Sequence, residues 1–169
     1  MDVFDAIKTR LEVRNYSSEP VPREILKEIL EAGRLSPSGL NSQHWRFIIV
    51  EDRKDLAELA EISTSGKWVA GAAFAVVVLT NPKYPWHLID AGRAVTQMQL
   101  AAWNKGVGSC IYTGYDEKAM RQRLNIPENY HIACVVGFGY PQRRILGRKR
   151  RLPLESIAYS GQMGVTFKP

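Results

Sequence analysis

The run from Ala73 to Thr80 constrains the fold more than any other part of the chain. It reads AFAVVVLT, with no polar residue before its last position and no alternation of apolar and polar side chains. A strand covered on one face alternates, whereas an unbroken apolar run is typical of a strand that is buried on both faces. Asn81 and Pro82 end the run. The segment therefore predicts a central strand in a sheet that carries helices on both sides.

Shorter patterns on either side predict the rest of the sheet and its helices. Val-, Ile- and aromatic-rich runs indicate further strands at residues 45–50, 107–112 and 132–138. Apolar residues at helical spacing indicate helices at 3–11, from Pro22 to before Ser36, and at 52–62, 89–105 and 117–124. No internal repeat or linker divides this order. We therefore expect one α+β domain over residues 1–169.

Composition excludes several other classes of protein. Charged residues make up 24% and hydrophobic residues 45%, which are ordinary values for a globular chain. The longest uncharged apolar run, Val69 to Leu79, is too short to span a bilayer. Cys110 and Cys134 stand alone, so neither a disulfide framework nor a CxxC pair is present. Together with an acidic start that has no apolar signal segment, this predicts a cytoplasmic protein that does not enter the membrane.

The last residues, 152–169, do not fit the pattern of the rest. Residues 160–164 are loose in composition, and Val165-Thr166-Phe167 predicts a short strand. The segment is too long for a frayed end and too short for a domain. We expect it to pack on a partner subunit; the alternative is a disordered end.

The formal charge of +6 is unevenly spread. Six cations occupy nine residues near the C-terminus: Arg143, Arg144, Arg148, Lys149, Arg150 and Arg151. Such a cluster predicts an anionic ligand, either nucleic acid or the phosphate of a small molecule. No helix-turn-helix or RNP-like pattern accompanies the charge, and aromatic residues do not interleave with it. A nucleic-acid-binding module is therefore the less favoured interpretation, and we expect no nucleic-acid partner.

The sequence contains none of the usual motifs for catalysis by protein side chains. Two stretches begin like GxGxxG, but Ile111 and Gln142 stand where the third glycine belongs. No GxxxxGK[ST] loop and no GxSxG elbow occurs, and the three histidines lack the spacing of a zinc site. We therefore expect no bound metal and no catalytic side chain. An enzyme of this kind takes its chemistry from a cofactor.

Three segments have the residue types to hold a cofactor. Arg10 and Arg14 are four apart, which puts both on one helical face if the first helix continues that far; a solvated surface pair is the alternative. The loop at 36–43 offers short polar side chains and backbone groups to a flat polar ring, and it could equally be a plain loop. The basic run at 148–151 can neutralise a phosphate dianion.

Taken in order, these segments resemble the nitroreductase family of flavin enzymes. The family has an Arg-x-x-x-Arg pair near its N-terminus, followed by a run close to APSxxNxQPW. Here the pair is Arg10 and Arg14, and residues 35–47 read LSPSGLNSQHWRF. Later stretches agree in order, at residues 90–102, 105–109, 124–127, 136–141 and 148–155. The resemblance runs from about residue 4 to about residue 158.

The resemblance implies an α+β, three-layer fold with a central, mainly antiparallel or mixed sheet, and a homodimer that binds FMN at its interface. Arg10 matches the arginine on the phosphate side, and Arg14 a cation near the ribityl chain and the pyrimidine edge of the flavin. The loop that reaches the flavin from the other subunit is matched by Pro37, Ser38, Gly39, Asn41 and Gln43. The turn whose backbone N–H faces flavin N5 is matched by Thr113 and Gly114, and the C-terminal phosphate clamp by Lys149 and Arg151.

Two positions depart from the family pattern. Glu12 stands where the family commonly has a serine that binds the phosphate. Because a carboxylate repels a phosphate, we expect Glu12 to turn away or to pair with a nearby arginine. His44 replaces the usual proline.

The activity implied is hydride transfer from NADH or NADPH through FMN to a nitroaromatic, a quinone or a similar small acceptor. A specialised reaction on the same fold is the alternative, either reductive dehalogenation or a biosynthetic dehydrogenation.

Overall fold

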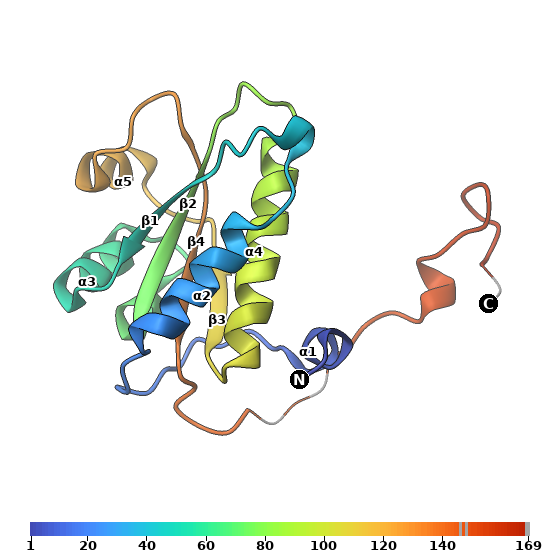
Figure 1. Cartoon of the computed structure of the whole chain (residues 1–169), viewed down its shortest axis with the longest axis horizontal. Helices are drawn as coiled ribbons and strands as arrows, with labels where there is room; N and C mark the ends of the chain where they lie inside the picture. Colours follow the sequence, from blue (N-terminus) through green and yellow to red (C-terminus); the bar gives the residue numbers. More distant parts are fainter. Residues whose placement is uncertain (146, 148, 168–169) are drawn as a thin grey trace.

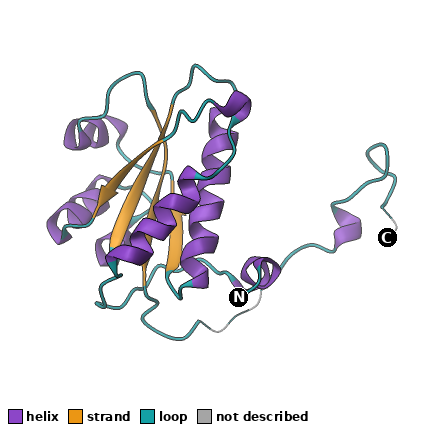
Figure 2. Ribbon diagram, in the orientation of Figure 1, coloured by secondary structure: helices purple, strands orange, loops and turns teal. Residues whose placement is uncertain are grey.

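The computed structural model describes residues 1–145, 147 and 149–167, and at its centre lies a four-stranded sheet. The strands are β1 (Arg46–Val50), β2 (Phe74–Thr80), β3 (Gly108–Tyr112) and β4 (His131–Gly139). They pair antiparallel in the order β1-β2-β4-β3, which leaves β1 and β3 at the edges (Figure 2). All seven residues of β2 are buried, so the strand predicted to be covered on both faces is confirmed.

Helices cover both faces of the sheet (Figure 1). On one face, α2 (Arg23–Arg34) and α4 (His87–Asn104) pack against Phe74, Val76 and Val78. On the other, α3 (Arg53–Ile62) and α5 (Glu117–Leu124) belong to the cluster that contains Ala75, Val77 and Leu79. Successive residues of β2 thus point into two different cores, as the pleat of a strand requires. The predicted three-layer α+β fold is confirmed.

The first helix is shorter than its sequence pattern indicates. α1 spans Val3–Thr9 and ends at Arg10, and the following residues are extended. The N–H of Val13 donates to the carbonyl of Ser109 at 2.9 Å, so pairing with β3 replaces further helical turns. The first helix therefore does not continue to Arg14, and the condition for Arg10 and Arg14 to share a helical face is not met.

The apolar face of α1 is also not buried in this chain. Val3 and Phe4 are 73% and 63% exposed, and within α1 only Ala6 is buried.

The C-terminal segment leaves the body of the molecule after the basic run (Figure 1). It contains one turn of 3₁₀ helix, Leu154–Ser156, and a single bridge between Tyr159 and Thr166. The strand predicted over residues 165–167 does not form, because its hydrogen bonds close a local turn instead of extending a sheet. The large apolar side chains of this segment are exposed: Leu152, Leu154, Ile157 and Met163. Within the described part of the chain, no helix is both long and apolar enough to cross a membrane.

Candidate functional site

Three cations gather beside the end of α1, although one of them lies about 140 positions before the other two in the chain. Arg10 caps α1, while Lys149 and Arg151 come from the C-terminal basic run. The ammonium group of Lys149 donates to the backbone carbonyl of Ile7. Partial burial lowers the pKa of Lys149, and the neighbouring charges of Arg10 and Arg151 lower it further. Cations that lie this close to one another form a natural site for an anion. We call Arg10, Lys149 and Arg151 the cation cluster.

A hollow of about 650 Å³ opens beside the cation cluster, within the size range of small-molecule sites. Lys149 and Arg151 line it together with Thr9, Leu11 and Trp103.

Glu12 is the carboxylate nearest to these cations, and it is paired. Arg10 donates to Oε1 of Glu12 at 2.5 Å, which confirms the pairing expected for this departure from the family pattern. Burial, and after it the carboxylate of Glu12, raises the pKa of the Cys110 thiol to about 11. Cys110 is therefore protonated at neutral pH and lacks the thiolate character of a nucleophile.

Arg14 lines a second hollow of about 500 Å³, which it shares with Glu12, Arg143 and Arg144. Within the described residues, no carboxylate lies at ion-pair distance from Arg14. Of the other two cations of the basic run that opens at 143, Arg150 is exposed and Arg148 falls outside the residues that the structure describes.

The 36–43 loop adopts an unusual backbone. A 3₁₀ turn covers Gly39–Asn41, and φ is positive at Leu40, Asn41 and Gln43 (53°, 51° and 46°). Each such residue costs about 1 kcal/mol or more, and strain of this kind is concentrated at functional sites. The loop holds its shape partly by itself. Ser38 Oγ accepts from the N–H of Gln43 at 2.9 Å, and Gln43 Nε2 donates to Oδ1 of Asn41 at 3.2 Å.

Further contacts hold this loop against the start of α4, and the sequence patterns did not indicate them. The N–H of Gly39 donates to Oδ2 of the buried Asp90 at 3.0 Å, and His44 Nε2 lies 3.1 Å from the same oxygen. The indole of Trp86 lies so close to Gly39 that a Cβ there would collide with it. One feature of the sequence could have identified Asp90: it is the acidic residue in the first turn of α4, on a helix face that is otherwise apolar.

Buried polar atoms without partners also collect near this loop. Within the described residues, the hydroxyls of Ser36 and Ser42 and the indole nitrogen of Trp86 make no hydrogen bond. Such groups are rare in folded proteins and cost free energy unless a ligand or water satisfies them. The loop therefore has the character of a binding surface.

The turn after β3 is more constrained than the resemblance implies. The N–H of Gly114 donates to Ser65 Oγ at 3.2 Å, and its carbonyl accepts from the N–H of Thr64 at 2.9 Å. The backbone of Gly114 is thus already engaged within the chain. We therefore expect the N–H of Thr113, rather than that of Gly114, to be the donor that faces flavin N5.

The 36–43 loop and the cation cluster lie at opposite ends of α4 (Figure 1). The loop is tied to Asp90 in the first turn of the helix. Thr9, next to Arg10, accepts a hydrogen bond of 2.9 Å from Nε1 of Trp103 in the last turn. The 18 residues of α4 span about 27 Å at 1.5 Å per residue. A single chain therefore does not bring together all the residues that the resemblance assigns to one site.

With this geometry in place, comparison with known proteins identifies the family. The model of the Nitroreductase family matches residues 7–81 and 63–140. The chain belongs to the nitroreductase family. This membership makes it an oxidoreductase.

Individual relatives agree with the assignment. The chain is 38% identical over 145 residues to a protein of Archaeoglobus fulgidus with the provisional name NADH dehydrogenase/NAD(P)H nitroreductase, covering 80% of this chain and 83% of that one. It is 26% identical over 164 residues to an iodotyrosine deiodinase of Thermotoga neapolitana, covering 82% and 88%. Among solved structures it is similar to an FMN-dependent nitroreductase from Clostridium difficile R20291, with a TM-score of 0.87, 26% identity and coverage of 94% and 99%.

Proposed function

We propose that this nitroreductase is an FMN-dependent oxidoreductase that transfers hydride from NADH or NADPH to a nitroaromatic, a quinone or a similar small acceptor. The cation cluster carries the proposal. A phosphate monoester has about two negative charges and three acceptor oxygens, and several converging cations are what it requires. The likeness to a solved FMN-dependent nitroreductase supports the same cofactor.

The residues of the chain would bind and orient the cofactor. When bound, FMN would supply the chemistry, by accepting hydride from the nicotinamide and passing it to the acceptor. Arg10, Lys149 and Arg151 would hold the phosphate, and Arg14 would place a cation near the pyrimidine edge of the flavin. Asn41 and its neighbours in the 36–43 loop, together with Thr113, would contact the ring. No protein acid or base is needed for the hydride step.

We further propose that the active form is a homodimer with both cofactor sites at the interface. In one chain the 36–43 loop and the cation cluster lie at opposite ends of α4, a helix about 27 Å long, so a second copy would supply one wall of each site. Two apolar surfaces are available to cover each other or the partner. They are the outer face of α1, with Val3, Phe4 and Ile7, and the C-terminal segment, with Leu152, Leu154 and Ile157.

The proposal is tested on the purified full-length protein. We expect a yellow dimer that binds one FMN per chain and is bleached anaerobically by NADH or NADPH. Arg10→Ala combined with Arg151→Ala should weaken FMN binding by about two to four powers of ten while leaving the far-ultraviolet circular dichroism unchanged. Arg123→Ala is the matched control, because Arg123 lies on α5 and pairs with Asp55 and Glu58. A colourless protein without measurable affinity for FMN, or a fully loaded monomer, would contradict the proposal.

Reductive dehalogenation is the second candidate, favoured by the similarity to the Thermotoga neapolitana protein. In that reaction, two electrons and a proton replace a carbon–iodine bond by carbon–hydrogen and release iodide. Iodide release from 3-iodotyrosine, compared with the consumption of a nitroaromatic and a quinone by the same FMN-loaded protein, separates the two candidates. Dominant iodide release would favour the second.

A further inference from the structure

We propose that Asp90 and His44 are positioning residues that hold the 36–43 loop in the shape the cofactor site needs. The inference rests on the proposed FMN site, but its evidence is a hydrogen-bond network within the chain. Neither residue is placed in contact with the cofactor. They act through the backbone of Gly39 and through the segment that connects β2 to α4.

The carboxylate of Asp90 is the centre of the network. Its side chain is wholly buried, in the first turn of α4. Oδ2 accepts from the N–H of Gly39 at 3.0 Å and faces His44 Nε2 at 3.1 Å. Oδ1 accepts from the Arg93 guanidinium at 3.3 Å. A buried carboxylate is tolerated only when donors of this kind satisfy it, so the loop backbone and Asp90 fix each other.

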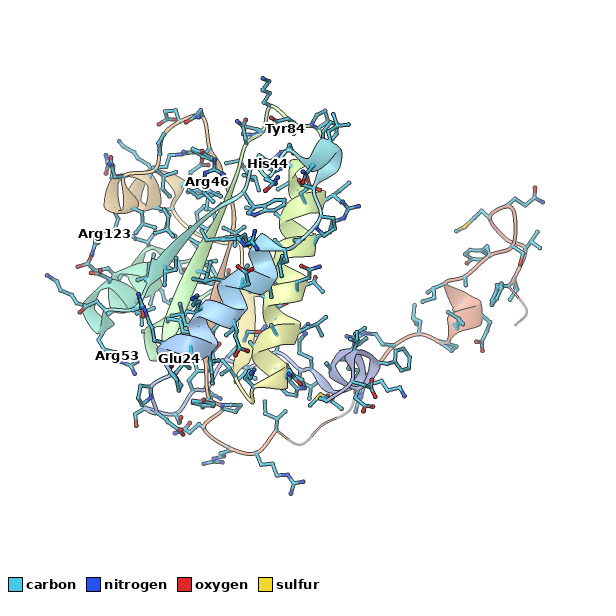
Figure 3. The ribbon with its side chains drawn as sticks, in the orientation of Figure 1. Glu24, His44, Arg46, Arg53, Tyr84 and Arg123 are labelled. Carbon is cyan, nitrogen blue, oxygen red and sulfur yellow. The ribbon has the colours of Figure 1, made fainter. Side chains whose placement is uncertain are left out.

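His44 connects this network to a second segment. Its Nδ1 accepts from the N–H of Asn81 at 3.3 Å, so the proton lies on Nε2, which therefore donates to Asp90. The imidazole also stacks on Tyr84, with 5.0 Å between ring centroids and 22° between planes (Figure 3). His44 thus links the 36–43 loop, the 81–86 segment and α4.

The loop needs an external anchor because its own conformation is unfavourable. Leu40, Asn41 and Gln43 all have positive φ, which residues with a side chain rarely adopt. Leu40, at its tip, is 88% exposed and contributes no apolar anchor. The bond from Gly39 to Asp90 joins the turn directly to α4, and the indole of Trp86 blocks movement of Gly39 toward it. Without the Asp90 oxygen, we expect the loop to relax toward ordinary backbone angles.

Two substitutions of Asp90 test the network, one that removes its hydrogen bonds to the loop and one that can keep them. Asp90→Ala removes both acceptor oxygens. Asp90→Asn can place its amide oxygen where Oδ2 lies and so keep both the Gly39 and the His44 bonds. Its NH₂ group would then face only Arg93, whose side chain is 49% exposed and can move away. Arg93→Ala is the control that removes one member of the network without touching the loop.

Two measurements on the full chain report on the loop. Hydrogen exchange of the cofactor-free protein measures protection of the amides at 38–43, and quenching of flavin fluorescence gives the dissociation constant for FMN. We expect Asp90→Ala to deprotect the loop and to weaken FMN binding by about tenfold or more, while Asp90→Asn and Arg93→Ala stay within about threefold of the unchanged protein. Met120→Ala, in the opposite core, controls for a general loss of stability.

The outcomes separate the two proposals. Failure of the unchanged protein to bind FMN would overturn the proposed function, and with it the role given to the loop. Normal FMN binding that Asp90→Ala leaves unaltered would overturn only the positioning role. Two other results would also overturn only the positioning role. One is that Met120→Ala, at an equal loss of melting temperature, weakens FMN binding as much as Asp90→Ala does. The other is that Asp90→Asn fails to restore FMN binding.

Discussion

Removing Arg10 should both delete a cation and release a carboxylate, and the two effects can be separated. Arg10 holds Glu12 at 2.5 Å, with 21% and 38% of the two side chains exposed. In Arg10→Ala, the FMN phosphate would lose a charge-assisted hydrogen bond and would face an unpaired Glu12. In Arg10→Ala combined with Glu12→Gln, only the hydrogen bond is lost. The two substitutions and their combination form a double-mutant cycle.

The magnitudes follow from the two terms. A hydrogen bond between charged groups contributes about 1.5–3 kcal/mol, which is about 10- to 100-fold in affinity. A carboxylate about 4 Å from one phosphate charge in a water-like medium adds about 1 kcal/mol of repulsion, or about fivefold. Arg10→Ala should therefore weaken FMN binding by about 50- to 500-fold. The double variant should recover about fivefold of that loss, and Glu12→Gln alone should tighten binding by a few-fold.

The assay is a titration of cofactor-free protein with FMN, followed by flavin fluorescence at constant ionic strength. Arg123→Ala serves again as the control, since Figure 3 shows Arg123 on the opposite side of the molecule from α1, beside which the cation cluster lies. Affinity of Arg10→Ala equal to that of the unchanged protein would refute the placement of the phosphate. A double variant that binds no better than Arg10→Ala would refute the role given to Glu12.

Three further outcomes are expected. FMN binding should take up protons at alkaline pH, because burial and the charges of Arg10 and Arg151 lower the pKa of Lys149 and a phosphate beside it would raise that pKa again. Calorimetry in buffers of different ionisation enthalpy measures the uptake, and zero uptake across the range in which Lys149 titrates contradicts the prediction. Burial raises the thiol pKa of Cys134 from 9.0 to about 12. The unfolded chain therefore releases this proton first, and the free energy of unfolding should fall between about pH 9 and 12; melting curves should show a shallower fall in Cys134→Ala. Stopped-flow reduction of bound FMN should be slowed in Arg14→Ala and stay within about tenfold in Cys110→Ala, and the reverse order would place the essential group in the thiol.

The sequence predicted the three layers of the fold because a run of consecutive apolar residues indicates a strand that is buried on both faces. The apolar run of β2 has no alternation, and the structure places its odd and even residues in two cores. The end of α1 was not predictable in the same way. The helical spacing of Leu11 favours another turn, and the competing partner of Val13 is Ser109, which lies 96 positions away in the chain.

In the candidate site, too, short sequence motifs identified residues, whereas contacts between residues far apart in the chain could not be predicted. The resemblance names the 36–43 loop and the basic residues, but their placement at the two ends of α4 follows only from the packed structure. The contact between His44 and Asp90 joins residues 46 apart, at a position where the family commonly has proline. Glu12 was easier to interpret, because a carboxylate among cations has few alternatives to pairing.

The length of α4 also bears on how two cofactors in a dimer would influence each other. If each chain contributes opposite ends of this helix to two different sites, those sites are separated by a distance of the order of 27 Å. At that distance two unit charges interact by only about 0.6 kcal/mol in a medium of effective dielectric about 20, so the charge on one flavin has little effect on the other. The two active sites of one dimer should then load and turn over as independent units, with hyperbolic rather than sigmoidal dependence on donor concentration.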